Sequence, residues 1–355
     1  MERGGSNMSC ISKKWGFGGI FVIAVLCLAV AAWAFEPIPI EEYKKWPNNW
    51  GKWGPDDEIG TLNYNTPEKI VEAARLVKKG KIIPVSWRAE YFKYPLWGNR
   101  VGIERFMNWS GADVMANPKP GLTYTDEIIK VESHGMSHVD PLGHLWYGDK
   151  MYNGYPVAKY IKHDQGMLKN NANAYLPHSA GRGVLLDVAR YKGVDYLGDK
   201  YLITAEELDA VAKWENVEIK PGDAVLIRTG FMKHWAKIVQ QGRRWRATED
   251  GEPGPGCDFI EWAQEKKIGL VGADNIAVEH IVPVEKECNE KYKVPLIPLH
   301  VAVLQMLGVP MQEILDLDAL SEDCAQDGVY EFFYVWPPLN FWNAAGGLIS
   351  PVAIK

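Results

Sequence analysis

The hydrophobic positions downstream of residue 66 follow two periods, one typical of helices and one typical of strands. Apolar residues at helical spacing, between a capping residue and a turn, predict helices at 66–80, 204–213, 258–267 and 299–307. Short apolar runs between turn residues predict strands at 81–92, 184–188, 224–229, 268–271 and 329–335. The last of these runs alternates, so one face carries Tyr330, Phe332 and Tyr334. Strands that alternate with helices predict an α/β domain with a mixed β core and helices around it.

Two of the predicted helices begin with capping signals. Thr66 precedes Pro67, so Thr66 is the expected N-cap and Pro67 the first helical residue. Thr204 precedes Glu207 at the spacing of a capping box, in which each side chain bonds the amide of the other residue.

The first 65 residues lack this periodic pattern and divide into two segments. Residues 1–34 are typical of an export signal, with basic residues before the apolar run 15–34 and small residues at its end. Residues 35–65 are rich in Trp, Pro, Gly and Asn, which predicts an irregular segment before a single domain at 66–355. We expect a periplasmic or secreted protein. If the signal is not cleaved, residues 15–34 would instead anchor the chain in a membrane.

Composition narrows the function classes. The chain has 355 residues, 47% of them hydrophobic, and a net charge of −6, which argues against a nucleic-acid partner. No second apolar run approaches the length of a membrane span, so membrane contact is expected only through the N-terminal segment. Three cysteines follow residue 34, and an odd number leaves at least one unpaired or bonded between chains. We expect packing roles for Cys257, Cys288 and Cys324.

The stretch HGMSHVDPLGH at 134–144 carries the clearest chemical signal. His134, His138 and Asp140 form a mixed nitrogen and oxygen ligand set suited to Zn²⁺, Mn²⁺ or Fe²⁺. Three protein ligands leave coordination positions open, as in catalytic sites. Even numbers of positions separate residues 134, 138, 140 and 144, and residues spaced in this way share one face of a strand. The spacing therefore predicts a strand and a following turn, with the ligands and His144 facing one cavity.

The stretch resembles the signature of the cyclase family of metal-dependent hydrolases, which includes bacterial kynurenine formamidase and isatin hydrolase. The family pattern is H-x-G-T-H-x-D-x-P-x-H, and the three histidines and the aspartate match it in register. Met136, Ser137 and Pro141 depart from it and leave the substrate open. Further similar segments are WGPDDEIGTLN at 53–63, GRGVLLDV at 181–188, PGDAVLIRTG at 221–230, GADNIAVE at 272–279, and the closing DGVYEFFYVWPPL and SPVAIK.

The resemblance implies a single domain of the swivelling β/α type, with a β-barrel-like core, that forms homodimers or homotetramers. It also implies a second half of the metal region, formed by His300 and by Glu313 or its neighbour Gln312. Family members bind two zinc ions or one manganese ion, so we expect one or two ions of Zn²⁺ or Mn²⁺. A carboxylate at 313 would allow a second metal, with Asp140 as the bridge.

The sequence also predicts roles for other polar and aromatic residues. A carboxylate at Asp274 or Glu279 could orient a ligand histidine, or serve as an ion-pair or turn residue. Structural ion pairs are expected for Arg182 and Arg228. Surface or packing roles are expected for His163, His178, His234 and His280. Aromatic walls for a flat aromatic or cyclic substrate are expected from Trp53 and Trp146.

These residues predict a metal-dependent hydrolase that cleaves an amide or cyclic amide C–N bond of a small molecule. His144 is the expected catalytic residue, placed to move a proton from water to the leaving nitrogen. No G-x-S-x-G motif is present, which argues against a serine nucleophile. Two alternatives remain open: a lactone hydrolase or cyclase/dehydratase that uses the same metal site, and an exported non-catalytic metal- or ligand-binding protein.

Overall fold

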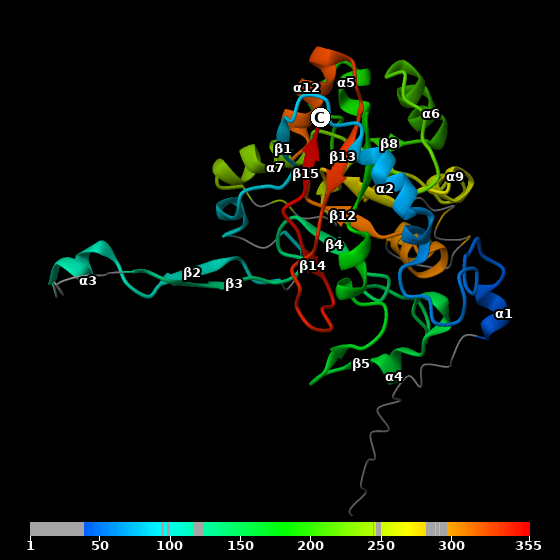
Figure 1. The fold of residues 1–355 in the computed structure, drawn as a ribbon, viewed down its shortest axis with the longest axis horizontal. Coiled ribbons are helices and arrows are strands. Elements are labelled where there is room, and N and C mark those ends of the chain that lie inside the picture. The colour runs from blue at the N-terminus through cyan, green and yellow to red at the C-terminus, as the bar shows by residue number, and fades with distance from the viewer. Residues whose placement is uncertain are drawn as a thin grey trace, which may run out of the picture. The chain divides into compact units, whose positions relative to one another are not determined.

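A curled, half-barrel sheet of nine strands forms the centre of the domain, and helices surround it (Figure 1). The computed structural model describes residues 39–93, 96–97, 100–116, 124–243, 245, 250–281, 288, 291 and 297–355. In sheet order the strands are β1 (Ile82–Pro84), β15 (Val352–Ile354), β13 (Glu331–Val335), β7 (Ala180–Asp187), β9 (Ala224–Arg228), β11 (Leu270–Ala273), β12 (Met311–Glu313), β4 (His138–Asp140) and β14 (Gly347–Leu348).

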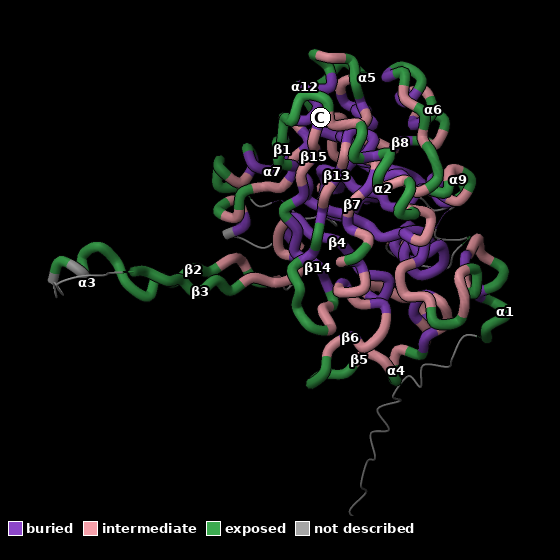
Figure 2. Tube along the Cα trace, in the orientation of Figure 1, coloured by how far each residue is buried: buried purple, intermediate pink, exposed green. Residues whose placement is uncertain are grey.

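The sheet is mixed. Strands β7, β9, β11 and β12 are parallel neighbours, and every other pairing in this sheet is antiparallel. Strands β7, β9 and β11 are mostly apolar and buried along almost their whole length, as expected when both faces of a sheet are covered (Figure 2). Three two-stranded sheets lie outside it: β2 (Glu104–Met107) with β3 (Glu127–Lys130), β5 (Ile161–Lys162) with β6 (Gly166–Met167), and β8 (Leu202–Ile203) with β10 (Gly254–Pro255).

The described helices are short, and several connect successive strands of the sheet. The α-helices are α1 (Ile40–Tyr43), α2 (Pro67–Ala74), α3 (Gly111–Ala116), α4 (Val157–Tyr160), α5 (Val188–Tyr191), α6 (Ala205–Trp214), α7 (Phe231–Gln240), α9 (Phe259–Lys266), α11 (Pro298–His300) and α12 (Asp318–Asp327). The 3₁₀ segments are η1 (Gly60–Tyr64), η2 (Ala89–Lys93), η3 (Tyr152–Gly154) and η4 (Ala172–His178). Helix α11 continues into a π-helical turn, η5 (Val301–Leu307).

The hydrophobic pattern predicted most of these elements. The strands at 184–188, 224–229, 268–271 and 329–335 and the helices at 204–213, 258–267 and 299–307 are confirmed within a few residues. The aromatic face of β13 is also confirmed, because Tyr330, Phe332 and Tyr334 are buried while their neighbours are more exposed.

Two predicted elements are shorter than the pattern suggested. The helix after Thr66 ends at Ala74 in tighter turns, and the amides of Lys79 and Lys81 then bond the carbonyl of Lys355. The strand predicted at 81–92 is limited to β1 and is followed by η2. In both cases a long-range contact or turn overrides the local pattern.

The capping predictions were right in part. The Thr204 hydroxyl accepts the amide of Glu207, as predicted. The Glu207 carboxylate instead accepts the hydroxyl of Tyr201, so the reciprocal half of the capping box is wrong. Thr66 is the N-cap of α2 but makes no side-chain bond with a helix amide.

Within the segment 35–65, the described part contains α1 and η1, two short helices that the composition did not predict. The segment packs onto the domain through side-chain bonds from Asn49 and Trp50 to the carbonyls of Leu307 and Gln305. The predicted export signal lies outside the described residues. Among the residues that the structure describes, no helix is long and apolar enough to cross a membrane.

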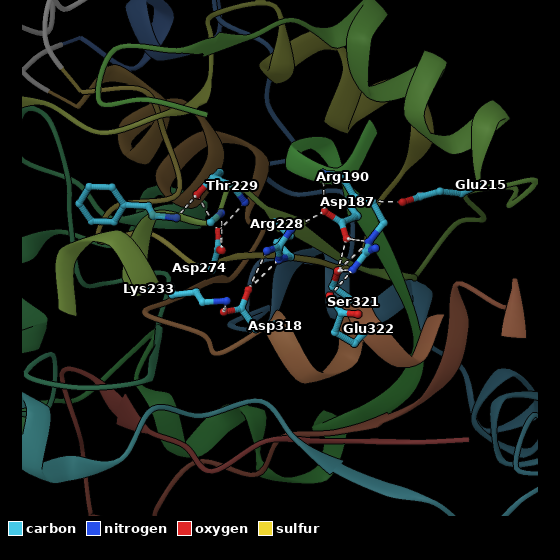
Figure 3. Close-up of polar contacts among 12 residues, drawn as sticks. Asp187, Arg190, Glu215, Arg228, Thr229, Lys233, Asp274, Asp318, Ser321 and Glu322 are labelled. Carbon is cyan, nitrogen blue, oxygen red and sulfur yellow. Dashed lines mark hydrogen bonds and ion pairs between the residues drawn. The ribbon is translucent and has the colours of Figure 1, made fainter. Parts of the chain in front are cut away.

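Ion pairs join neighbouring strands of the sheet, as predicted for the two arginines. Arg228, at the end of β9, bonds Asp187 at the end of β7 and also Asp318 at the start of α12 (Figure 3). Arg182 pairs with Asp223 and Glu331. Both arginines therefore tie neighbouring strands to the chain around them.

The expectation for the cysteines was wrong for two of the three. Cys257 and Cys288 form a disulfide bond that links residues 31 positions apart. Cys324 is free and buried, as expected of a packing residue. The pair could not be found from the sequence, because only the fold brings the two positions together.

Candidate metal centre

Strands β4 and β12 bring the two halves of the site together. They pair antiparallel, with His138 opposite Glu313 and Asp140 opposite Met311. The residues thus come from segments more than 170 positions apart, yet the register places His138 and Glu313 directly across from each other. His134 lies in the turn before β4, and His300 closes α11.

The side chains form two groups that share Asp140. His134 and His138 direct Nε2 toward Oδ1 of Asp140, at 3.3 and 3.2 Å. His300 Nε2 lies 3.7 Å from the other oxygen, Oδ2, and 3.0 Å from Oε1 of Glu313. In each group of three, the potential ligand atoms lie within 4.8 Å of one another, and all five residues are buried.

The unsatisfied polar atoms of this cluster fit a divalent cation. Nε2 of His134 and of His138 and both carboxylate oxygens of Asp140 are buried, and within the described part of the chain they make no well-formed hydrogen bond. A buried carboxylate without a partner is energetically costly, so such atoms usually bind a cation or another polar group. Imidazole and carboxylate ligands suit Zn²⁺ or Mn²⁺.

Each of the three histidines uses its other ring nitrogen to contact the protein. Nδ1 of His138 lies 2.7 Å from the carbonyl of Met136, and Nδ1 of His134 lies 3.1 Å from Oγ of Ser133. Nδ1 of His300 lies 2.5 Å from Oε1 of Glu279. Contacts of this kind select the tautomer that leaves Nε2 free for a metal and hold the ring in place.

Strand geometry decides whether Glu313 or Gln312 is the candidate metal ligand. Successive side chains of a strand point to opposite faces. Glu313 faces the cluster, where its Oε2 lies 3.1 Å from Nε2 of His138, whereas Gln312 points away and accepts the hydroxyl of Tyr334 at 2.6 Å. Glu313 is therefore the candidate ligand.

The two carboxylates at 274 and 279 have separate roles. Glu279 accepts the amides of Leu299 and His300 in addition to its contact with the His300 ring. The Asp274 carboxylate accepts the amide and hydroxyl of Thr229 and the amide of Gly230, so it holds the turn after β9 (Figure 3). Of the pair, Glu279 contacts a ligand candidate.

Replacing Glu279 by Gln should weaken metal binding about 10- to 100-fold, the usual effect of losing a carboxylate behind a ligand histidine. The amide can still accept backbone bonds, so the fold should survive. Titration of the metal-free protein with Zn²⁺ would measure the change. Asp274→Asn is the matched control and should leave metal affinity nearly unchanged; equal weakening in both variants would contradict a specific role for Glu279.

His144 borders the cluster on its open side. Its Nε2 lies 3.7 Å from Oδ2 of Asp140, and its ring stacks on that of His134 with centroids 3.9 Å apart. The side chain is 23% exposed, against 11% or less for His134, His138 and His300. Burial lowers the pKa of His144 to about 3, with Asp140 only partly opposing this, so the ring is neutral at neutral pH.

The metal-free site should hold protons that a metal must displace. Burial favours the neutral form of His138, but the carboxylates of Asp140 and Glu313, 3.2 and 3.1 Å from its Nε2, outweigh burial and raise the pKa of His138 to about 9. His300 behaves alike: burial is outweighed by Glu279 and Glu313, and its pKa is well above the ordinary value. Both histidines are therefore protonated at neutral pH without metal.

Metal binding at neutral pH should consequently release protons, and metal affinity should rise as the pH approaches 9, the pKa of His138. Calorimetry in two buffers of different ionisation enthalpy measures the number of protons released. A binding enthalpy that does not depend on the buffer would contradict this prediction.

Backbone strain adjoins the two glutamates that contact the His300 ring. Val278, next to Glu279, and Ile314, next to Glu313, have φ of 58° and 59°. This left-handed region is unfavourable for β-branched residues and costs on the order of 1–3 kcal/mol each. Asn275 holds the backbone at both positions. Its side-chain oxygen accepts the amide of Val278, and its backbone carbonyl accepts the amide of Ile314, each at 2.8 Å. Strain of this kind is concentrated at functional sites.

Two contacts at the site had no signal in the sequence. Gly346, just before β14, lies so close to His134 that a Cβ there would be 2.3 Å from Cε1 of its ring, so only glycine fits. Arg100 donates to the carbonyl of His134 at 2.8 Å. Both residues are remote from His134 along the chain, and only the fold makes them neighbours.

One predicted detail of the site, the strand position of His134, differs in the structure, and three neighbouring side chains can be placed. His134 lies in a turn and not in the strand that the even spacing suggested. Ser137 binds backbone, donating to the carbonyl of Ile314 at 2.6 Å. Trp53 packs edge-to-face on Tyr64, with centroids 5.1 Å apart. Trp146 is half-buried, two residues after His144.

The curled sheet and the buried cluster together define an α/β domain with a candidate centre for divalent metal. The model of the family described as "Putative cyclase" matches residues 57–280. A solved structure described as a novel cyclase is 36% identical, covers 87% of this chain and 100% of its own, and superposes with a TM-score of 0.78. The chain therefore belongs to the Cyclase family.

More distant solved structures share the fold. Isatin hydrolase A from Labrenzia aggregata is 17% identical, with 81% of this chain and 99% of that chain covered and a TM-score of 0.53. Isatin hydrolase A from Ralstonia solanacearum is 18% identical, with coverage of 77% and 91% and a TM-score of 0.54. A search of curated proteins found no match.

Proposed function

We propose that this protein is a metal-dependent hydrolase that cleaves the C–N bond of an amide or cyclic amide, the formamide or lactam of an aromatic or cyclic small molecule. The observation that carries the proposal is the buried cluster in which two potential ligand groups share Asp140. Membership of the Cyclase family and the fold shared with isatin hydrolases support it.

The residues of the cluster fit one or two ions of Zn²⁺ or Mn²⁺. His134 and His138 would hold the first with Asp140, and His300 and Glu313 the second, with Asp140 common to both groups. When bound, such a cation supplies a water acidified toward neutral pH and a positive charge opposite a developing oxyanion.

His144 would carry out the proton transfers. Its neutral ring would take a proton from the attacking water at Nε2 and return it to the leaving nitrogen. The Asp140 carboxylate, 3.7 Å away, would stabilise the ring while it is charged. The partial exposure of His144 leaves it accessible to a substrate above the cluster.

The test is hydrolysis of isatin and of an aryl formamide by the purified protein, before and after chelation and after return of Zn²⁺ or Mn²⁺. Activity should disappear on chelation and return with metal. His144→Ala should keep its metal content but lose about 10²- to 10⁴-fold in turnover, the usual contribution of a general acid–base residue. Unchanged turnover in this variant would remove that role from His144.

The substrates also separate the alternatives. Hydrolysis of lactones but not of amides would favour a lactonase or cyclase. Stoichiometric metal without turnover of any of these substrates would favour a binding protein. A His138→Ala variant prepared in parallel should lose its metal, which would show that the metal binds at this cluster.

Export from the cytoplasm remains part of the proposal. The disulfide between Cys257 and Cys288 supports it, because such bonds persist mainly in oxidising compartments. Mass spectrometry of the N-terminus of the mature protein would show whether residues 1–34 are removed.

A further inference from the structure

A cavity of about 340 Å³ lies where strand β9 ends, among residues that do not belong to the metal centre. Its wall is formed by α5, the turn after α5, the last residue of β9 and the first turns of α7 and α12. Pockets that bind small molecules have volumes of roughly 300–1,000 Å³, and in α/β sheets they lie beyond the carboxyl ends of parallel strands. The size and the position of this cavity therefore both fit a small-molecule site.

Arg228 forms a rigid part of the cavity wall. It is buried, and its guanidinium group bonds Asp187 at 2.9 Å and Asp318 at 2.9 and 2.7 Å (Figure 3). Nε of Arg190 lies 3.2 Å from the same Asp187 carboxylate and 3.1 Å from Oγ of Ser321. Guanidinium groups that are held from several sides keep their positions when a ligand arrives, so little ordering is needed on binding.

Other charged side chains of the cavity wall are more exposed. Lys233 is 49% exposed and lies 3.4 Å from a carboxylate oxygen of Asp318. Glu322 is 68% exposed and pairs with Arg190 at 2.6 Å. Asp195, in the turn after α5, is also exposed. Ion pairs between exposed side chains add little to stability, so these groups can exchange their present partners for a ligand at small cost.

The cavity wall carries positive and negative groups in equal number. Its charged residues are Arg190, Arg228 and Lys233, and Asp195, Asp318 and Glu322. A ligand with a single charge would meet as many like charges as opposite ones, and like charges oppose binding. A ligand that carries both charges can place its anionic end at a basic side chain and its cationic end at a carboxylate. Val194 and Ala319 add apolar surface to the wall.

We propose that this cavity is a second small-molecule site, which binds a free α-amino acid in its zwitterionic form. The carboxylate of the ligand pairs with Lys233 and Arg190, and its ammonium group pairs with Asp195 and Glu322. The cavity volume suits one amino acid with an aliphatic side chain. Within the described part of the chain, no candidate metal ligand lines this cavity, so binding does not require the metal.

The test is isothermal titration calorimetry of the full chain with L-leucine, as purified and after chelation of bound metal. The wild type should bind leucine with a Kd below about 1 mM, and chelation should leave this value unchanged. Isopentylamine and 4-methylpentanoate share the carbon skeleton of leucine, but each carries only one of its two charges. Both should bind at least about 10-fold more weakly than leucine, because half of the charged groups in the wall then lack an opposite partner.

Two single variants connect the binding to this cavity. Lys233→Ala and Glu322→Ala each remove one exposed charge from the wall, and each should weaken leucine binding about 10-fold. Lys237→Ala is the matched control, because Lys237 is exposed one turn further along α7 and does not line the cavity. The far-ultraviolet spectra of the three variants should match that of the wild type, since the buried pair of Arg228 and Asp187 stays intact.

Four results would overturn the proposal. The first is a wild type that releases no heat of binding at millimolar leucine. The second is equal affinity for leucine and for either of the two analogues with a single charge, which would exclude a zwitterion site. The third is unchanged leucine affinity in either Lys233→Ala or Glu322→Ala. The fourth is loss of leucine binding on chelation, which would assign the amino acid to the metal centre instead of this cavity.

Discussion

Asp140→Asn should abolish both metal binding and hydrolysis. Asp140 is buried and belongs to both ligand groups, so its replacement removes one ligand from each. The amide is neutral and cannot balance the charge of two cations. Loss of several kcal/mol of transition-state stabilisation corresponds to a fall of about 10³-fold or more in kcat/KM.

The measurement combines elemental analysis of the purified variant with hydrolysis assays. Wild type should carry one or two equivalents of metal, and Asp140→Asn close to none. Asp274→Asn is a suitable control, because Asp274 is also buried and, among the described residues, its carboxylate bonds residues 229 and 230 and no candidate ligand. An Asp140→Asn variant that retains full metal content and turnover would be incompatible with the shared-ligand arrangement.

Removal of the disulfide should lower the free energy of unfolding by about 3–4 kcal/mol. The bond between Cys257 and Cys288 closes a loop of 31 residues, and the chain-entropy estimate for a loop of this length has that size. The double variant Cys257→Ala/Cys288→Ala should therefore unfold at clearly lower denaturant concentration, with metal content kept.

Cys324→Ala provides the comparison, since Cys324 is buried and unpaired. It should cost about 1 kcal/mol, as expected for a small truncation in a core. Equal losses in the two variants would show that the disulfide adds nothing beyond the packing of its sulfur atoms. Urea unfolding followed by fluorescence is suitable, because the chain contains fifteen tryptophans.

Sequence reasoning succeeded where the physical signal is local. Apolar runs predicted β7, β9 and β11, because a strand covered on both faces must be apolar along its length. The Thr204 cap was predicted because the bond it makes spans only three residues. Two predictions failed at residues 75–92, where the amides of Lys79 and Lys81 bond the C-terminal residue.

The candidate site likewise has some features that the sequence predicted and others that only the fold determined. Its residue types and the short spacing from His134 to His144 were visible in the chain, as was the resemblance that pointed to His300 and Glu313. The choice of Glu313 over Gln312 needed β12, whose alternation sends one side chain to the cluster and the other to Tyr334. The assignment of Glu279 rather than Asp274 to His300 likewise needed the turn that follows β11.

The sequence by itself therefore determined the α/β class, the family resemblance and the ligand types, because periodicity, capping and motif spacing are written in neighbouring residues. Only the tertiary structure decided which carboxylates face which histidines, which cysteines pair and which apolar residues remain uncovered. These features depend on strand register and on contacts between segments more than a hundred residues apart, such as His138 with Glu313. No local pattern encodes such contacts, because many distant partners are compatible with each residue until the sheet is assembled.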